Sequence, residues 1–200
     1  LFNRDLLALF RGEEIDPPTF DFEAKKRVYQ GGRFRLATNQ VVIVEGIHSL
    51  NPQLTRAIPD AEKFRIYVSA MTQLQIDSHN RISTTDNRLI RRMVRDSEFR
   101  GHSAIDTIRM WPSVRRGEER WIFPFQSEAD VFFNSALDYE LAVLKPIAEP
   151  LLMQVKPMHV EYAEARRLSA FLLNFLGIPD RQVTSTSILR EYIGHSGFRY

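Results

Sequence analysis

The sequence predicts an α/β fold, and three apolar segments carry that prediction. Residues 41–46, VVIVEG, place four β-branched side chains in a row, which is typical of a strand buried on both faces of a parallel sheet. Residues 64–69, FRIYVS, predict a second strand, and a short helix expected over 51–58 joins the two as a βαβ unit. A third strand is expected at 130–135, DVFFNS.

Helices and turns are predicted around these strands. Residues 3–11 predict a helix that ends at Gly12, and a hairpin is expected over about 27–36 because Gly31–Gly32 tolerate the positive φ of a tight turn. Residues 111–125, WPSVRRGEERWIFPF, indicate a polar and aromatic loop. Apolar spacing predicts four further helices, at 86–100, 136–152 with an interruption near Pro146, 160–175 and 186–193.

The composition is that of an ordinary globular protein of 200 residues, with 44% hydrophobic and 26% charged residues. The formal net charge is only +2, which argues against a large polyanion-binding surface, so nucleic acid is not an expected partner. The absence of cysteine excludes disulfides, thiol catalysis and Cys-ligated zinc. Since the sequence has no signal peptide and no apolar run near about 18 residues, we expect a soluble, cytoplasmic protein with no membrane partner.

Positive charge is concentrated in one segment, RLIRRMVRDSEFRG at 88–101, which carries five arginines. We expect a helix with Thr85 or Asp86 as its N-cap and Gly101 as its stop. Its apolar face carries Leu89, Ile90, Met93 and Val94, and the opposite face carries Arg88, Arg92 and Arg95, with Arg91 beside them.

Two interpretations of this helix stay open from the pattern alone. Like charges on one helix face repel, so something anionic must offset them. One interpretation is a solvated face neutralised by Asp86, Asp96 and Glu98. The other is a face that binds phosphate oxygens, to which the planar guanidinium fork is suited.

The order of the motifs resembles the uridine kinase and phosphoribulokinase family. That family has a strand ending in Glu-Gly, a second strand, and a helix with the pattern RxxRRxxRDxxxRG, matched here by VVIVEG, FRIYVS and RLIRRMVRDSEFRG. FDF at 20–22 resembles the family's Tyr-Asp-Phe. WPSVRRGEE, IFPFQSEADVFFNSALDYELAVLK and SILREYIG resemble a bacterial subgroup of nucleoside kinase-like proteins with a threonyl-tRNA-synthetase-like N-terminal region. The resemblance implies part of a P-loop-kinase-type parallel sheet flanked by helices, with a small hairpin and a helical C-terminal extension.

The resemblance assigns the arginine helix to a lid that closes over ATP and the phosphoryl group in transfer. Arg92, Arg95 and Arg100 match the family's lid arginines and are the expected catalytic residues. Arg92 would reach the acceptor, and Arg95 and Arg100 the nucleotide phosphates. Phosphoryl transfer relies mostly on positioning and electrostatic stabilisation, which guanidinium groups on a mobile element can supply.

Further ATP-binding candidates are Arg91, Arg115 and Arg116. Arg115 and Arg116 have an alternative, which is pairing with Glu118 and Glu119.

A metal role is implied for Glu45, which ends the strand VVIVE. In an α/β fold the carboxyl end of a strand is where ligands bind. The resemblance implies that Glu45 helps to hold Mg²⁺ through water, and the alternative is a carboxylate that caps the strand–loop junction.

The acceptor-binding candidates are Phe20, Asp21 and Lys25, together with Arg92. Phe20 stands where the family has a Tyr against the pyrimidine ring, so it can stack but has no hydroxyl to donate. Lys25 stands where uridine kinases place a His, and His102 stands where they have an Arg. The resemblance therefore implies a nucleoside-like small-molecule acceptor whose identity stays open.

The phosphate-cradling motif G-x-x-x-x-G-K-[ST] does not occur in these residues, since no glycine is followed by lysine. The resemblance implies that this chain is the C-terminal portion of a kinase. Residues 1–157 would belong to the kinase domain and 158–200 to the helical extension. We expect the chain alone not to catalyse phosphoryl transfer. We also expect the strand at 41–46, without neighbours on its edge, to favour a homo-oligomer.

Three functions follow from these observations. The first is ATP-dependent phosphoryl transfer to a nucleoside or similar hydroxyl compound by the full-length protein, with ATP and Mg²⁺ as cofactors. The second is a regulatory, nucleotide-binding module that keeps the fold without the chemistry. The third is an RNA-binding protein, which the subgroup's synthetase-like region suggests.

Overall fold

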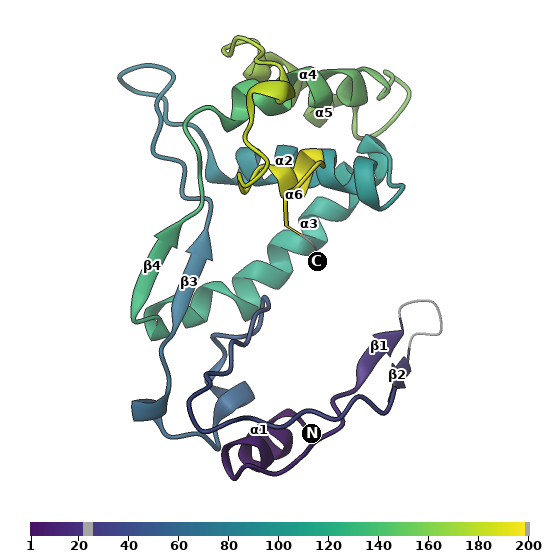
Figure 1. The fold of residues 1–200 in the computed structure, drawn as a ribbon. Helices are drawn as coiled ribbons and strands as arrows, with labels where there is room; N and C mark the ends of the chain where they lie inside the picture. Colours follow the sequence, from purple (N-terminus) through teal and green to yellow (C-terminus); the bar gives the residue numbers. More distant parts are fainter. Residues whose placement is uncertain (22–25, 199–200) are drawn as a thin grey trace. The chain divides into compact units, whose positions relative to one another are not determined.

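The computed structural model describes residues 1–21 and 26–198, which form an α/β fold in two compact units (Figure 1). The first unit comprises Leu1–Tyr67 and Glu118–Val131, and the second comprises Val68–Gly117 and Phe132–Tyr200. The two predicted domains, 1–157 and 158–200, divide the chain differently, and that boundary stays a prediction. Residues Arg190–Ile193, which fall in the predicted extension, pack with the arginine helix in the second unit.

The first unit contains a helix and a small antiparallel strand pair. Helix α1 spans Phe2–Phe10 and is followed by Gly12 at φ 72°, which confirms the predicted stop. Strand β1 (Thr19–Asp21) pairs antiparallel with β2 (Lys26–Val28). This antiparallel pair lies earlier in the chain than the hairpin predicted over 27–36. Its ladder pairs Thr19 with Val28, and Gly31–Gly32 do not form its turn. The expected helix at 51–58 is a 3₁₀ turn, Pro52–Thr55, and two more such turns are Asp60–Glu62 and Phe123–Glu128.

A two-stranded parallel sheet is formed by β3 (Ile66–Ser69) and β4 (Val131–Asn134), which confirms two of the predicted strands (Figure 1). The Val131 amide donates to the Arg65 carbonyl at 3.2 Å, and the Ser135 amide donates to the Ser69 carbonyl at 2.9 Å. Helices α2 (Thr84–Phe99) and α3 (Ala104–Trp121) lie between the two strands in the chain, so the βαβ connection joins these strands and not the pair predicted.

The prediction of a buried strand at 41–46 was wrong. These residues have no strand assignment, and Val41 and Ile43 are 84% and 87% exposed. A central strand needs neighbours that satisfy its backbone N–H and C=O groups and cover its side chains. No described segment pairs with 41–46, so Val41 and Ile43 stay exposed, and Val42 and Val44 are only half-buried.

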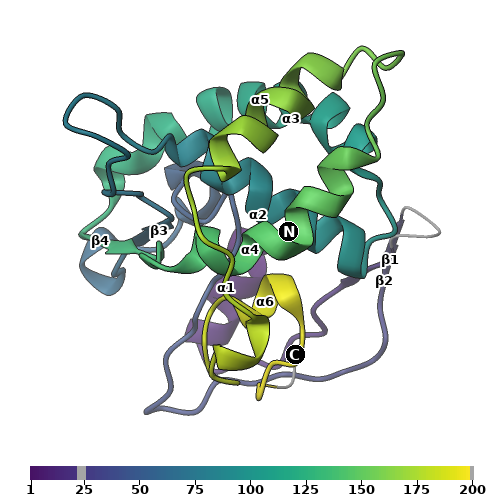
Figure 2. The same cartoon turned by 90° about the horizontal axis from the view of Figure 1, so that it is seen from above.

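The second unit is built on helices that share one apolar core. Helix α4 (Glu140–Met153) packs against α2 and α5 (Tyr162–Leu172), and the short α6 (Arg190–Ile193) packs against α2 (Figure 2). The most deeply buried core side chains include Leu89, Ile90, Leu144, Leu168 and Leu189. Burial of this kind stabilises a fold by roughly 25 cal/mol per Å² of apolar surface.

Prolines interrupt the helices less than predicted. Helix α3 continues through Pro112, where a loop was expected, and α4 continues through Pro146 and Pro150. Each proline removes one helical hydrogen bond. The buried faces of both helices, which include Trp111 and Leu144, hold the flanking turns in place through tertiary packing.

Among the described residues, no helix combines the length and the apolar character that crossing a lipid bilayer requires.

Candidate functional site

The arginine helix forms as an amphipathic helix. It begins at Thr84, two residues earlier than predicted, so the expected N-cap at Thr85 or Asp86 was wrong. Its N-cap is Ser83, whose hydroxyl accepts a hydrogen bond from the Asp86 amide at 3.3 Å. The helix ends before Gly101, which has φ 64° as a helix stop requires. Leu89, Ile90, Met93 and Val94 are all buried in the core, which confirms the predicted apolar face.

Arg91 is a structural residue in this fold. Its side chain is 5% exposed, and its Nε donates to Glu140 Oε2 at 3.0 Å, while its Nη2 donates to the Ser135 carbonyl at 2.7 Å. Glu140 is buried as well and also accepts from Asn87. The guanidinium therefore ties α2 to the start of α4. It has no free edge at the surface with which to reach a phosphate, and we leave Arg91 out of the candidate ATP-binding residues.

Asp96 organises two of the three predicted catalytic arginines. Its carboxylate is fully buried and accepts from Arg92 Nε at 3.0 Å and from Arg100 Nη1 at 2.8 Å. Thr107 Oγ1 on α3 lies 3.5 Å from the same carboxylate. The carbonyl of Asp96 accepts from the amides of Arg100 and His102, both at 3.1 Å. This one residue therefore fixes both the end of the helix and the direction of two guanidinium groups.

The three predicted catalytic arginines are partly exposed to solvent. The side chains of Arg92, Arg95 and Arg100 are 26%, 27% and 45% exposed. Arg92 and Arg100 place two positive charges against the single negative charge of Asp96, which leaves one positive charge at this point. Arg95 pairs with Glu191 from α6 at 2.6 Å. Partly exposed guanidinium groups that outnumber the nearby carboxylates can bind an anion such as phosphate.

Two of the carboxylates predicted to neutralise the arginine helix, Asp96 and Asp86, bind different arginines. Asp96 does pair with arginines of its own helix, as the solvated-face interpretation expected. Asp86 is engaged by Arg167 of α5, whose two Nη atoms donate to it at 2.7 Å each. Arg167 also donates to Glu164, and the hydrogen bonds that Glu164 and Asp86 accept raise the pKa of Arg167, with the bond to Glu164 as the largest cause.

The second pair of candidate arginines lies on α3. Arg115 is half-buried and takes part in a polar interaction, whereas Arg116 is exposed. Their predicted part in the phosphate site stays a prediction.

The acceptor and metal candidates belong to the first compact unit. Phe20 is 48% exposed on β1, opposite Arg27, and Asp21 is half-buried beside it. Lys25 lies outside the described residues. Glu45 is exposed at the end of the unpaired segment 41–46. Within residues 1–21 and 26–198, no three His, Cys, Asp or Glu side chains gather into a metal cage.

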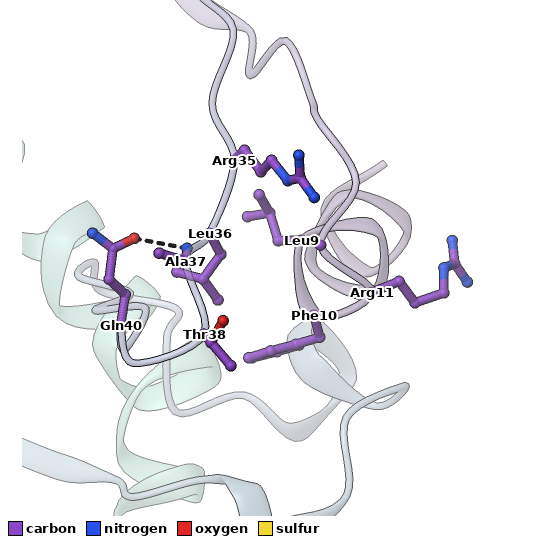
Figure 3. A pocket seen from close by; sticks show the side chains of 9 residues that line it. Leu9, Phe10, Arg11, Arg35, Leu36, Ala37, Thr38 and Gln40 are labelled. Carbon is purple, nitrogen blue, oxygen red and sulfur yellow. Dashed lines mark hydrogen bonds between the residues drawn. The ribbon is translucent and has the colours of Figure 1, made fainter.

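A pocket of about 630 Å³ lies between the end of α1 and residues 35–40 (Figure 3). Leu9, Phe10 and Leu36 form apolar walls, and Arg35 extends its guanidinium toward the helix. The Ala37 amide donates to Gln40 Oε1 at 2.9 Å and closes the turn beside it. None of the predicted site residues lines this pocket.

Two carboxylates that bind arginines of α2 could not be predicted from the sequence pattern. Glu140 and Glu191 lie 49 and 96 positions from the arginines that they bind, so no local spacing links them. For Asp96 a signal existed, because its spacing of four from Arg92 and from Arg100 puts all three side chains on one helix face.

Comparisons with known proteins support the family that the order of the motifs indicated. The model of the phosphoribulokinase / uridine kinase family matches residues 1–142. Uridine kinase from Bacillus pumilus is 29% identical over 148 residues, covering 71% of this chain and 62% of that protein. Uridine kinase from Geobacillus kaustophilus is 28% identical over 160 residues, covering 74% of this chain and 67% of that protein.

The matched part of the chain thus spans slightly less than two thirds of the Bacillus relative. No solved structure matches the chain significantly. The family model covers more than half of the chain and includes the arginine helix. The chain belongs to the phosphoribulokinase / uridine kinase family.

Proposed function

We propose that the full-length protein transfers a phosphoryl group from ATP to a nucleoside-like acceptor, that Arg92 reaches the acceptor, and that Arg95 and Arg100 contact the nucleotide phosphates. The observation that carries this proposal is the Asp96 contact. It directs two guanidinium groups from a buried carboxylate while both arginine side chains stay partly exposed to solvent. In phosphoryl transfer the charge that develops on the equatorial oxygens is stabilised by preorganised cations of this kind.

The acceptor is proposed to be a nucleoside because the relatives are named uridine kinases. Phe20 offers an exposed ring on which a base can stack, and Asp21 follows it on β1. Lys25 and Arg92 complete the proposed acceptor set. Since Phe20 has no hydroxyl, it gives stacking without a hydrogen bond, so the preference for uridine over other bases is left to the assay.

Magnesium and ATP are the proposed cofactors. Mg²⁺ keeps several waters and is usually bound by one or two carboxylates plus substrate phosphates. A single exposed carboxylate at Glu45 fits that requirement. Bound to the nucleotide, the ion would neutralise phosphate charge, and Arg95, Arg100, Arg115 and Arg116 are the residues proposed to hold the phosphates from the protein side.

Activity is proposed for the full-length protein and not for residues 1–200 alone. These residues contain no G-x-x-x-x-G-K-[ST] sequence to cradle the phosphates. Isothermal titration of the 200-residue chain with Mg·ATP should show weak binding at most. Micromolar affinity would contradict this part of the proposal. Cytoplasmic location, self-association and membership of the synthetase-like subgroup stay predictions.

The decisive experiment is a coupled ADP-release assay of the full-length protein with a panel of nucleosides. Arg95→Ala should lower kcat by about 10²-fold or more, because it removes a cation that acts on the transferring phosphate. Arg166→Ala is the matched control, since Arg166 is an exposed arginine on α5 outside the candidate site. Equal turnover by Arg95→Ala and the parent would refute the role of the arginine helix. Nucleotide binding without turnover of any nucleoside would favour the regulatory module instead.

A further inference from the structure

The C-terminal residues contact the arginine helix, although they lie outside the span that the family model matches. That model ends at residue 142, whereas α6 spans Arg190–Ile193 and packs against α2 (Figures 1 and 2). Glu191 Oε1 accepts a hydrogen bond from Arg95 Nη1 at 2.6 Å. The ring of Tyr192 lies under two guanidinium groups, with its centroid 5.5 Å from Arg95 Cζ and 5.1 Å from Arg91 Cζ.

The short helix α6 is firmly anchored. Leu189 is fully buried and Ile193 is nearly so, which fixes α6 on the core. The buried Arg190 donates to the carbonyls of Asp180 at 3.0 Å, of Val183, and of Gly194 at 3.4 Å. Because these contacts hold the backbone on either side, Glu191 is directed at Arg95 by the fold and is not the tip of a loose tail.

The contact between Glu191 and Arg95 is specific but weak. The two side chains are 44% and 27% exposed, and an exposed ion pair shifts an equilibrium by less than about fivefold. Arg95 Nε is buried and has no hydrogen-bond partner among the described residues. The guanidinium is therefore held on its flat face by Tyr192 and on one edge by Glu191, with a donor still unsatisfied.

Carboxylate and phosphate oxygens bind a guanidinium in the same way, through in-plane N–H donors. A ring stacked on the flat face uses none of those donors. Tyr192 and Glu191 thus have different relations to an incoming phosphate. The ring can remain in place, whereas the carboxylate must release Nη1 before a phosphate can take the edge of the guanidinium.

We propose that α6 is a built-in competitor for the phosphate site, in which the Glu191 carboxylate occupies the position on Arg95 that a phosphate of the nucleotide takes. The proposal rests on the proposed phosphate role of Arg95. It gives Glu191 a regulatory function: ligand binding displaces its carboxylate from Arg95, and loss of the Glu191 charge favours phosphate binding.

The test is a calorimetric titration of the full-length protein with inorganic tripolyphosphate, carried out on the parent and three variants. Glu191→Gln should bind about two- to fivefold more tightly than the parent, because it removes the competing charge and keeps the side-chain shape. Glu164→Gln is the matched control. It neutralises a carboxylate that pairs with Arg167 at 2.7 Å, so the net charge changes equally at another site of the same unit. Its affinity should stay within a factor of about 1.5 of the parent. Arg95→Ala should bind at least about tenfold more weakly.

The other outcomes distinguish failure of the competition from failure of the phosphate role of Arg95. If Arg95→Ala loses affinity while Glu191→Gln equals the parent, the competition is refuted and the phosphate role of Arg95 survives. If Glu191→Gln and Glu164→Gln gain equally, a general charge effect explains the gain and the competition is again refuted. Weaker binding by Glu191→Gln would make Glu191 a positioning residue, contrary to the proposal. If Arg95→Ala binds as the parent does, the proposed phosphate role itself fails. Circular dichroism of each variant checks that the fold is retained.

Discussion

Replacing Asp96 by Asn should destabilise the second compact unit, because Asp96 is the buried anion that binds two cations. Its carboxylate accepts from Arg92 at 3.0 Å and from Arg100 at 2.8 Å and has no exposed surface. In Asp96→Asn one acceptor oxygen becomes an NH₂ group, which faces guanidinium donors and can accept nothing from them. At least one of the two charge-assisted hydrogen bonds is then lost.

The size of the effect follows from the exposure of the partners. A hydrogen bond to a charged group contributes about 1.5–3 kcal/mol, so two buried ones would give about 3–6 kcal/mol. The side chains of Arg92 and Arg100 are 26% and 45% exposed, so water can solvate the released guanidinium groups and the loss is smaller. We expect a decrease in the free energy of unfolding of about 2–3 kcal/mol.

The assay is urea unfolding of the chain, monitored by far-UV circular dichroism. Glu98→Gln is the matched control, since it removes the same charge from an exposed position of the same helix and should change the free energy by less than about 0.5 kcal/mol. A change below about 0.5 kcal/mol for Asp96→Asn as well would show that the buried contact does not hold the arginines. Asp96 would then not be the residue that orients Arg92 and Arg100.

Three further predictions concern the elements that carry the site. Glu140→Gln should cost about 3–5 kcal/mol in urea unfolding, since it leaves a buried guanidinium without its counter-charge; a loss under about 1 kcal/mol would contradict this. Gly101→Ala should lower the free energy of unfolding by about 1 kcal/mol, because Gly101 has a φ of 64° that alanine adopts only with strain. Gly117→Ala should raise the free energy of unfolding, because Gly117 lies inside α3 with open space around it. Equal effects of the two substitutions in thermal melts would contradict this expectation. The pKa of Asp106 is lowered chiefly by its hydrogen bond with Ser103, so its contribution to stability is present above the unfolded-state pKa of about 4 and is lost as pH falls through the lower folded-state pKa. Asp106→Asn should therefore flatten the acid side of the stability–pH curve below about pH 4, and an unchanged slope would refute the assignment.

The sequence by itself determined the features that depend on near neighbours in the chain. The spacing of Leu89, Ile90, Met93 and Val94 fixed the buried face of α2, since the period of a helix is set by backbone geometry alone. Gly101 ended that helix as predicted, because glycine tolerates positive φ. Strands β3 and β4 were also found from their β-branched and aromatic residues. The order of these motifs was enough to indicate the family.

Only the tertiary structure decided what each element touches. The run at 41–46 has the composition of a central strand, but a strand is buried only when neighbours pair with it, and here it is exposed. Five arginines look equivalent in the sequence, yet Arg91 enters the core with Glu140, whereas Arg95 meets Glu191 from 96 positions further along the chain. Such partners are chosen by packing across the whole chain. Local pattern can supply the charges of the candidate site, but only the folded core decides which of them stay available for a ligand.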